Sequence, residues 1–349
     1  MKKVILILIL VFSFLLTGAS CVRIKVGGFD GGVFKSTDKG LSWEQKVALM
    51  SIGQPKTIAG VNTTVLLFDP QDSNTLYLGT KEDGLFVSYD GAQSWQEIEK
   101  LPKGQINAIA VDPRAKHIVY VGMGGKIFKS MDCCRNWQNI YLEAVPGVEI
   151  SSLAIDSADN AKVLAGLSDG RLLRSTNGGI SWIKMYDFSA RIKQILINPK
   201  DTGIIYVLTA GNGIWRSADG GANWQSLDQG LQNYPGARDA DRMIFDPTKP
   251  DSLLISSSYG LLRTNDGGQT WVDYKLLIQP RRVKITSFAI NPKNPQEIYY
   301  TTATTFYRSS DEGKNWQTKS LPSKRMPVIM LVDPNNPNTI YLGVLKVEK

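Results

Sequence analysis

The chain has 349 residues, a formal net charge of +8 and a single histidine, His117. One histidine cannot build a histidine-based zinc site, and it weakens any proposal of a histidine-based catalytic triad. A charge of this size is moderate for the length and is not a nucleic-acid-binding signature, so we expect no nucleic acid partner. We also expect no cofactor and no metal, and the adjacent Cys133 and Cys134 predict no disulfide framework.

The N-terminus has the features of an export signal. Lys2 and Lys3 precede an unbroken apolar run from Val4 to Leu16, and small residues then lead to Cys21. The run is too short to cross a bilayer, and its order is typical of a signal peptide. We predict that residues 1–20 are removed and that the mature chain, 21–349, begins at Cys21. The cysteine resembles that of a bacterial lipobox, although Gly18 occupies the usual Leu position, so ordinary cleavage and lipidation of Cys21 both stay open.

One eight-residue pattern, which we call the Asp box, then recurs seven times along the chain. It reads Ser/Thr, any residue, Asp, any residue, Gly, any residue, Ser/Thr/Asn, Trp, and three copies depart from it mildly at Ala92, Cys134 and Asn177. The copies are Ser36–Trp43, Ser88–Trp95, Ser130–Trp137, Ser175–Trp182, Ser217–Trp224, Thr264–Trp271 and Ser309–Trp316.

A second motif, an Asp/Asn-Pro turn followed by an apolar strand, alternates with the Asp box. Between Thr64 and Ile98 the pattern predicts four short strands separated by the Asp69–Asn74 turn, the Lys81–Gly84 loop and the Asp90–Ser94 turn. Four antiparallel strands in a repeat of roughly 45 residues are typical of a propeller blade. We therefore predict an all-β fold, a single seven-bladed β-propeller over 21–349.

The two ends of the chain complement each other, which predicts how the ring closes. The first Asp box has no Asp-Pro turn before it, and Asp333-Pro334 has no Asp box after it. We predict that Val328–Gly343 supplies the inner strands of the blade whose outer strands lie in Val33–Gln45. Because Ile24–Gly27 also aligns with a second strand, closure by three strands plus one or by two plus two stays open.

With seven boxes, the chain resembles Asp-box (bacterial neuraminidase repeat) propellers. The segments Asn338–Gly343 and Gly32–Asp38 are similar to units of sortilin-type receptors, of xyloglucan-cleaving propeller hydrolases and of the photosystem II stability/assembly factor group. The resemblance covers essentially the whole mature chain and is specific for fold. It carries little information on function, because one fold hosts many functions.

The Asp-box residues are interpreted as determinants of the fold and not as catalytic acids. Asp and Ser/Thr side chains bond to backbone groups of a tight turn, Gly supplies a positive φ, and Trp is a large apolar anchor. The residues concerned are Asp38, Trp43, Asp90, Trp95, Asp132, Trp137, Asn177, Trp182, Asp219, Trp224, Asp266, Trp271, Asp311 and Trp316.

The variable half of every repeat maps to one face of the ring, where rigid scaffolds commonly place binding loops. Polar residues near the start of each inner strand predict a polar channel mouth, which is either simply hydrated or contacts a ligand. Cations of four consecutive blades would form a basic arc, either a solvated surface or a site for an anionic partner. The candidate binding residues are Arg191, Lys193, Arg238, Asp239, Asp241, Arg242, Arg281, Arg282, Lys284, Lys324 and Arg325.

We assign no catalytic residue and expect a non-enzymatic binding or scaffold protein. The Arg-Ile-Pro signature of sialidases is absent, and the resembling xyloglucanases draw their two carboxylates from two propellers, whereas this chain has one. Asp239 and Asp241 still leave a carboxylate pair open. We predict an exported monomer in the periplasm or at the cell surface that binds a protein partner, as the assembly-factor resemblance implies. Its only membrane contact would be a lipid on Cys21, if that cysteine is lipidated. The alternative is a carbohydrate-binding or glycoside hydrolase-like propeller that binds an envelope polymer.

Overall fold

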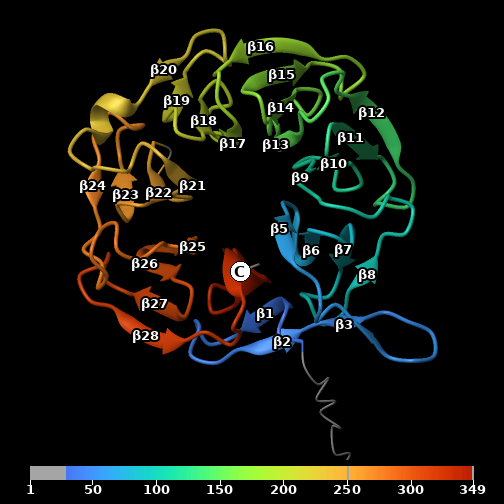
Figure 1. Cartoon of the computed structure of the whole chain (residues 1–349), viewed down its shortest axis with the longest axis horizontal. Coiled ribbons are helices and arrows are strands. Elements are labelled where there is room, and N and C mark those ends of the chain that lie inside the picture. Colours follow the sequence, from blue (N-terminus) through green and yellow to red (C-terminus); the bar gives the residue numbers. More distant parts are fainter. Residues whose placement is uncertain (1–28, 250, 348–349) are drawn as a thin grey trace, which may run out of the picture.

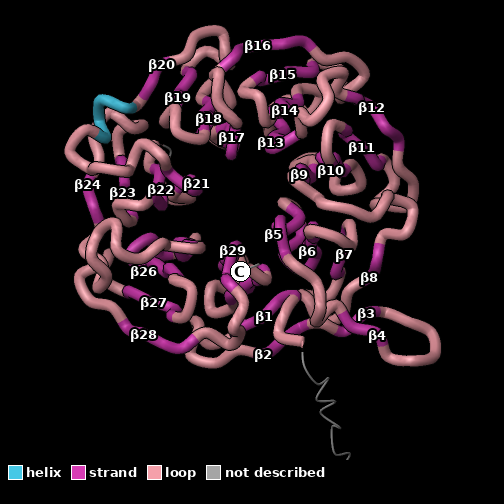
Figure 2. Tube along the Cα trace, viewed as in Figure 1, coloured by secondary structure: helices cyan, strands magenta, loops and turns pink. Residues whose placement is uncertain are grey.

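The computed structural model describes residues 29–249 and 251–347; the export signal, Cys21 and the segment Ile24–Gly27 lie outside them. Seven four-stranded antiparallel sheets stand in a ring, and we call the centre enclosed by their innermost strands the channel (Figure 1). The innermost strand of each sheet borders the channel, and the outermost strand lies on the rim (Figure 2). The predicted all-β, seven-bladed propeller is confirmed.

The blades are numbered from the one that joins the two ends of the chain, and their strands are listed from the channel outward. Blade 1 comprises β29 (Met326–Val332), β30 (Ile340–Leu345), β1 (Gly32–Ser36) and β2 (Glu44–Lys46), and blade 2 comprises β5 (Thr63–Asp69), β6 (Asp72–Thr80), β7 (Leu85–Ser88) and β8 (Gln96–Glu97). Blade 3 comprises β9 (Ala108–Val111), β10 (Val119–Met123), β11 (Lys126–Ser130) and β12 (Gln138–Leu142). Blade 4 comprises β13 (Ile150–Ile155), β14 (Val163–Leu167), β15 (Arg171–Ser175) and β16 (Ile183–Asp187).

Blades 5 to 7 follow the same order. Blade 5 comprises β17 (Ile192–Ile197), β18 (Ile205–Thr209), β19 (Ile214–Ser217) and β20 (Gln225–Ser226). Blade 6 comprises β21 (Ala240–Phe245), β22 (Leu253–Ser257), β23 (Leu261–Thr264) and β24 (Val272–Asp273). Blade 7 comprises β25 (Ser287–Asn291), β26 (Asn294–Thr301), β27 (Thr305–Ser309) and β28 (Gln317–Ser320). A short hairpin, β3 (Ala48–Leu49) and β4 (Lys56–Thr57), and a 3-10 turn, η1 (Asp228–Leu231), lie in the connections between blades.

Each Asp box closes the turn between the third and fourth strands of its blade. In blade 1 the Asp38 carboxylate accepts hydrogen bonds from the Ser36 hydroxyl at 2.7 Å, the Ser42 backbone N–H at 2.9 Å and the Ser42 hydroxyl at 2.5 Å. Asn177 makes the corresponding contacts in blade 4, accepting from the Ser181 backbone N–H at 2.9 Å. The side chain at this position therefore replaces backbone partners that the tight turn cannot supply.

The ring closes with two strands from each end of the chain. β1 pairs with β30 in antiparallel register, with Phe34 opposite Leu342, and β29 pairs with β30 on the channel side. Two-plus-two closure is thus the arrangement of the described residues. Three-plus-one closure would need Ile24–Gly27, which lies outside them.

The cores lie between blades rather than inside one sheet. Buried clusters combine strands of neighbouring blades, as where Ile150 of β13 packs against blade 3. Gly122 of β10 makes this approach possible, because a Cβ there would lie 2.8 Å from Ile150 Cγ2. A flat sheet has two apolar faces to bury, and each blade buries both against its two neighbours.

Candidate binding face

The two kinds of turn share one face of the ring, which we call the Asp-box face. The Gly91 N–H of an Asp box donates to Asn74 O of the preceding turn at 2.8 Å, and Gly178 donates to Ala161 O at 2.9 Å. The variable loops lie on the opposite face, which we call the loop face, where Ser168 N–H donates to Glu149 O at 2.9 Å. The predicted separation of rigid turns and variable loops is present.

A β-bulge recurs near the start of the inner strand in five blades, those of β5, β13, β17, β21 and β29. In blade 6, Ala240 pairs with Ser257 and Arg242 with Ser256, so Asp241 is the extra residue. A bulge re-aims side chains and is common near binding sites. The extra residues of the other four bulges are Thr64, Ser151, Lys193 and Val328. Asn107 and Thr286 hold the same position in blades 3 and 7, where they donate to Gly122 O and Thr301 O.

Ion pairs between blades occupy much of this channel mouth. Lys193 Nζ lies 2.7 Å from Asp239 Oδ1, and Lys284 Nζ lies 3.2 Å from Asp241 Oδ1. The hydrogen bond from Lys193 holds the pKa of Asp239 below its usual value, against the effect of partial burial. Asp239 therefore stays ionised, and each of the two aspartates contacts a lysine of a different neighbouring blade.

The basic arc is less continuous than the sequence suggests, because several of its cations have acidic partners. Arg191 lies 3.6 Å from Glu149, and Arg238 lies 2.8 Å from Asp228 of η1. Arg242 is half-buried in β21, and its Nε is buried with no hydrogen-bond partner within 29–249 and 251–347.

Arg325 is a correction to the predicted arc. Its side chain is 11% exposed, its Nη1 donates to Gly60 O, Val61 O and Asn62 Oδ1 at 2.9–3.0 Å, and its Nε lies 3.4 Å from Asp30. These partners belong to the N-terminal part of the chain, whereas Arg325 precedes the C-terminal inner strand. The residue joins the two ends of the ring and is not a free surface cation.

Three cations of the arc are exposed and lack a side-chain partner in the described part of the chain: Arg281, Arg282 and Lys324. Arg281 has a positive φ of 63° and donates its backbone N–H to Ser258 O at 2.8 Å, which places it at the tip of a tight turn. These three residues are the part of the arc that can still neutralise an anion.

An aromatic pair lies on the loop face near Arg281, which contacts Ser258, the residue before Tyr259. The rings of Tyr234 and Tyr259 meet edge to face with centroids 5.1 Å apart, and Tyr234 donates its hydroxyl to Trp271 O at 2.6 Å. Both side chains are half-buried. The hydrogen bond and the ring contact hold a rigid, partly exposed aromatic surface of the kind enriched at protein interfaces.

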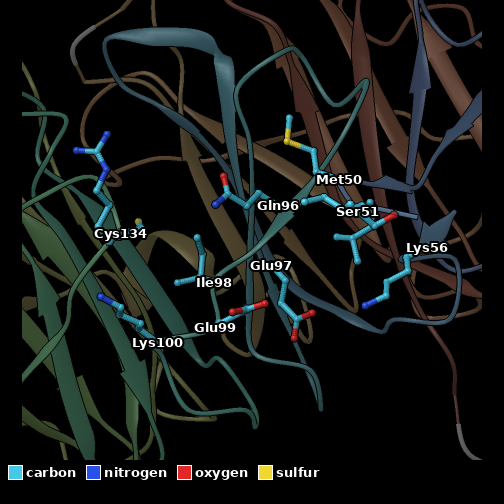
Figure 3. A pocket seen from close by; sticks show the side chains of 12 residues that line it. Met50, Ser51, Lys56, Gln96, Glu97, Ile98, Glu99, Lys100 and Cys134 are labelled. Atoms are coloured by element: carbon cyan, nitrogen blue, oxygen red, sulfur yellow. The ribbon is translucent and has the colours of Figure 1, made fainter. Parts of the chain in front are cut away.

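A groove on the rim escaped sequence reasoning. The hairpin β3–β4 pairs with blade 2 through Trp95, and the space beyond it measures about 970 Å³ and reaches Cys134 of the next Asp box. Figure 3 shows its mixed lining, with Met50, Lys56, Glu97 and other labelled side chains around the opening. The sequence feature that could have indicated this groove is the long connection between Trp43 and the Asp69 turn.

The described residues hold no group of three or more His, Cys, Asp or Glu side chains placed to bind a metal ion. Within the same ranges, no helix is long and apolar enough to span a bilayer.

Comparison with known proteins places this architecture among several kinds of propeller. The Sortilin-Vps10 family model, described as "Sortilin, neurotensin receptor 3", matches residues 170–260. The oligoxyloglucan-reducing end-specific xyloglucanase of Emericella nidulans is 34% identical over 121 residues, covering 33% of this chain and 14% of that protein. Matches to the xyloglucanases of Neosartorya fischeri and Acetivibrio thermocellus span 31% and 28% of those proteins, so the chain spans less than a third of these curated relatives.

Solved structures show the same fold at low identity. The GH74 xyloglucanase from Xanthomonas campestris has a TM-score of 0.67 and 18% identity, with 82% of this chain and 51% of that chain covered. The structure of YCF48 bound to a D1 peptide has a TM-score of 0.63 and 15% identity, with 83% and 94% covered. The resemblance expected from the sequence is confirmed: the chain is a seven-bladed β-propeller similar to those of sortilin-type proteins, GH74 xyloglucanases and the photosystem II assembly factor YCF48.

Proposed function

We propose that the propeller is a non-enzymatic scaffold that binds an acidic segment of a protein partner on its loop face. The observation that carries this proposal is that Arg281, Arg282 and Lys324, in the variable connections of the loop face, are exposed and unpartnered among the described residues, whereas Asp239 and Asp241 are already paired. Guanidinium groups bind carboxylates through paired hydrogen bonds, and the neighbouring Tyr234–Tyr259 pair adds apolar contact area. A similar propeller, YCF48, has been solved with a bound peptide, which supports a peptide ligand for this shape.

The test is capture of partners from native envelope by crosslinking, using the chain that begins at Cys21. In the wild type we expect capture of the partner to weaken as the salt concentration is raised. Arg281→Glu, Arg282→Glu and Lys324→Glu are combined in one variant, which we expect to lose this capture. A matched control reverses three exposed lysines of the Asp-box face: Lys200, Lys249 and Lys314. Equal yields from the two variants, with both folded, would contradict the proposal.

Export and anchoring form part of the same proposal. Similar proteins include an extracellular domain from Bacteroides thetaiotaomicron, which supports an extracytoplasmic location. We propose cleavage before Cys21, a lipid on that cysteine and a monomeric propeller held near the membrane. Intact-mass analysis of the mature protein checks the first two points: a mass increase matching acyl chains supports the anchor, and an unmodified N-terminus rejects it.

A hydrolytic role is the second candidate, because the curated relatives include xyloglucanases. An acid catalyst of a glycosidase needs a carboxyl group with a raised pKa, and Asp239 has a lowered one. The discriminating measurement is release of reducing sugar from xyloglucan by wild type and by Asp239→Asn. Activity that disappears in the variant would favour the enzyme over the scaffold.

A further inference from the structure

A contact repeats between neighbouring blades on the Asp-box face. In blade 3, Tyr120 of the second strand and Lys129 of the third both donate to Gly178 O, which follows the Asp-box position of blade 4, at 3.0 and 2.8 Å. In blade 1, Tyr341 and Lys35 contact Gly91 O at 3.2 and 2.9 Å.

Blade 5 repeats the contact with an arginine. Its Tyr206 donates to Gly267 O of blade 6 at 3.3 Å, and Arg216 Nε donates to the Tyr206 hydroxyl at 3.3 Å. The phenol of the second strand is therefore the group that joins one blade to the glycine carbonyl of the next. The third-strand cation either shares the carbonyl or supports the hydroxyl.

Blade 4 has the cation but lacks the phenol. Leu164 takes the place of the tyrosine opposite Arg174, in the register that pairs Tyr206 with Arg216. The glycine to be reached is Gly220, whose carbonyl oxygen accepts no hydrogen bond within the described residues. The Arg174 Nε is buried, and it too lacks a hydrogen-bond partner in that part of the chain.

The absence of a tyrosine side chain at position 164 leaves a cavity. A Cβ added at Gly220 would meet no heavy atom within 4 Å beyond its chain neighbours, whereas at Gly178 it would lie 3.2 Å from Lys129 Nζ and 3.6 Å from the Tyr120 hydroxyl. A cavity of about 270 Å³ lies there between blades 4 and 5, lined by Leu164, Arg174 and Gly220 among others. Cavities of about 150 Å³ already accept a benzene ring.

We propose that this cavity is a binding site for a phenolic group, which takes the place of the tyrosine that blades 1, 3 and 5 supply. The ring packs on Leu164, its hydroxyl donates to Gly220 O, and Arg174 Nε donates to the hydroxyl oxygen, as Arg216 does to Tyr206. Ile197 and Ile205 extend the apolar wall beside Leu164, and Asp156, Lys162 and Asp219 line the polar part of the cavity. The site lies on the Asp-box face and is independent of the loop-face proposal.

The probe is 4-methylphenol, titrated into the mature chain and followed by ligand-observed NMR. We expect one site with a Kd on the order of 1 mM, a value ordinary for a ligand of this size. Toluene, which lacks the hydroxyl, should bind about fivefold more weakly because the Gly220 and Arg174 contacts are lost. N-acetyltyrosinamide separates the sources: binding indicates a tyrosine side chain of another protein, and exclusion indicates a free small phenol.

Two variants locate the site. Leu164→Tyr should fill the cavity and abolish 4-methylphenol binding, with a melting temperature at or above that of the wild type. Tyr206→Leu, beside Arg216, should create a second such cavity and raise the stoichiometry to two, and this variant carries the test where Leu164→Tyr fails to fold. No saturable binding by the wild type at about tenfold the expected Kd, or binding that persists in a folded Leu164→Tyr protein, would overturn the proposal.

Discussion

Replacing Arg325 with alanine tests whether this residue closes the ring or serves as a surface cation. The substitution removes three hydrogen bonds of 2.9–3.0 Å to Gly60 O, Val61 O and Asn62 Oδ1, together with the Asp30 ion pair at 3.4 Å. Hydrogen bonds to charged groups contribute about 1.5–3 kcal/mol each, but water regains part of these acceptors. We therefore expect Arg325→Ala to lower the free energy of unfolding by about 3 kcal/mol.

The assay is thermal unfolding of the chain that begins at Cys21, compared with Arg281→Ala as the matched control. Arg281 is exposed and its side chain has no partner among the described residues, so its removal should leave the melting temperature unchanged. For a chain of this size, 3 kcal/mol corresponds to a decrease of roughly 5 °C. A melting temperature of Arg325→Ala within about 1 °C of the control would refute the assignment of Arg325 to ring closure.

Three further predictions concern the Asp boxes and the blade cores. Backbone and side-chain hydrogen bonds from Asn223 hold the pKa of Asp219 at about 2. This folded-state pKa lies below the unfolded value of about 3.9, so ionised Asp219 stabilises the fold. The stabilisation is present above pH 4 and is lost as the pH falls from about 4 to 2. Urea midpoints across that range should show this loss, and Asp219→Asn, which copies Asn177 of blade 4, should weaken the dependence; an unchanged slope would count against it. Asp219→Ala should lower the melting temperature without selectively removing partner capture, and a stable variant that lost only capture would show that the Asp box is functional. Trp95 is fully buried and donates to Lys46 O at 2.9 Å, so Trp95→Ala should cost about 3–5 kcal/mol in chemical denaturation, and a cost below about 1 kcal/mol would contradict its role as an anchor.

Turn chemistry and strand patterning are local properties, and they sufficed to predict the architecture. The Ser-x-Asp-x-Gly spacing determines which side chains reach which backbone groups within eight residues, so the Asp38 turn could be inferred without knowing its surroundings. Seven such boxes, with one unpaired motif at each end, also predicted the blade number and the partner strands of β1. The choice between closing arrangements needed the observed pairing of β1 with β30.

Contacts between residues far apart in sequence were decided only by the tertiary structure. Lys193 and Asp239 are 46 residues apart and pair because their blades, 5 and 6, are neighbours in the ring. Arg325 was predicted to be a surface cation. Nothing near it in the sequence indicates that its guanidinium donates to the backbone carbonyl of Gly60. A sequence shows which side chains are charged. Whether a charged side chain is buried, and which partner it contacts, depends on how neighbouring blades pack. This packing therefore determines which charges remain free to bind a ligand.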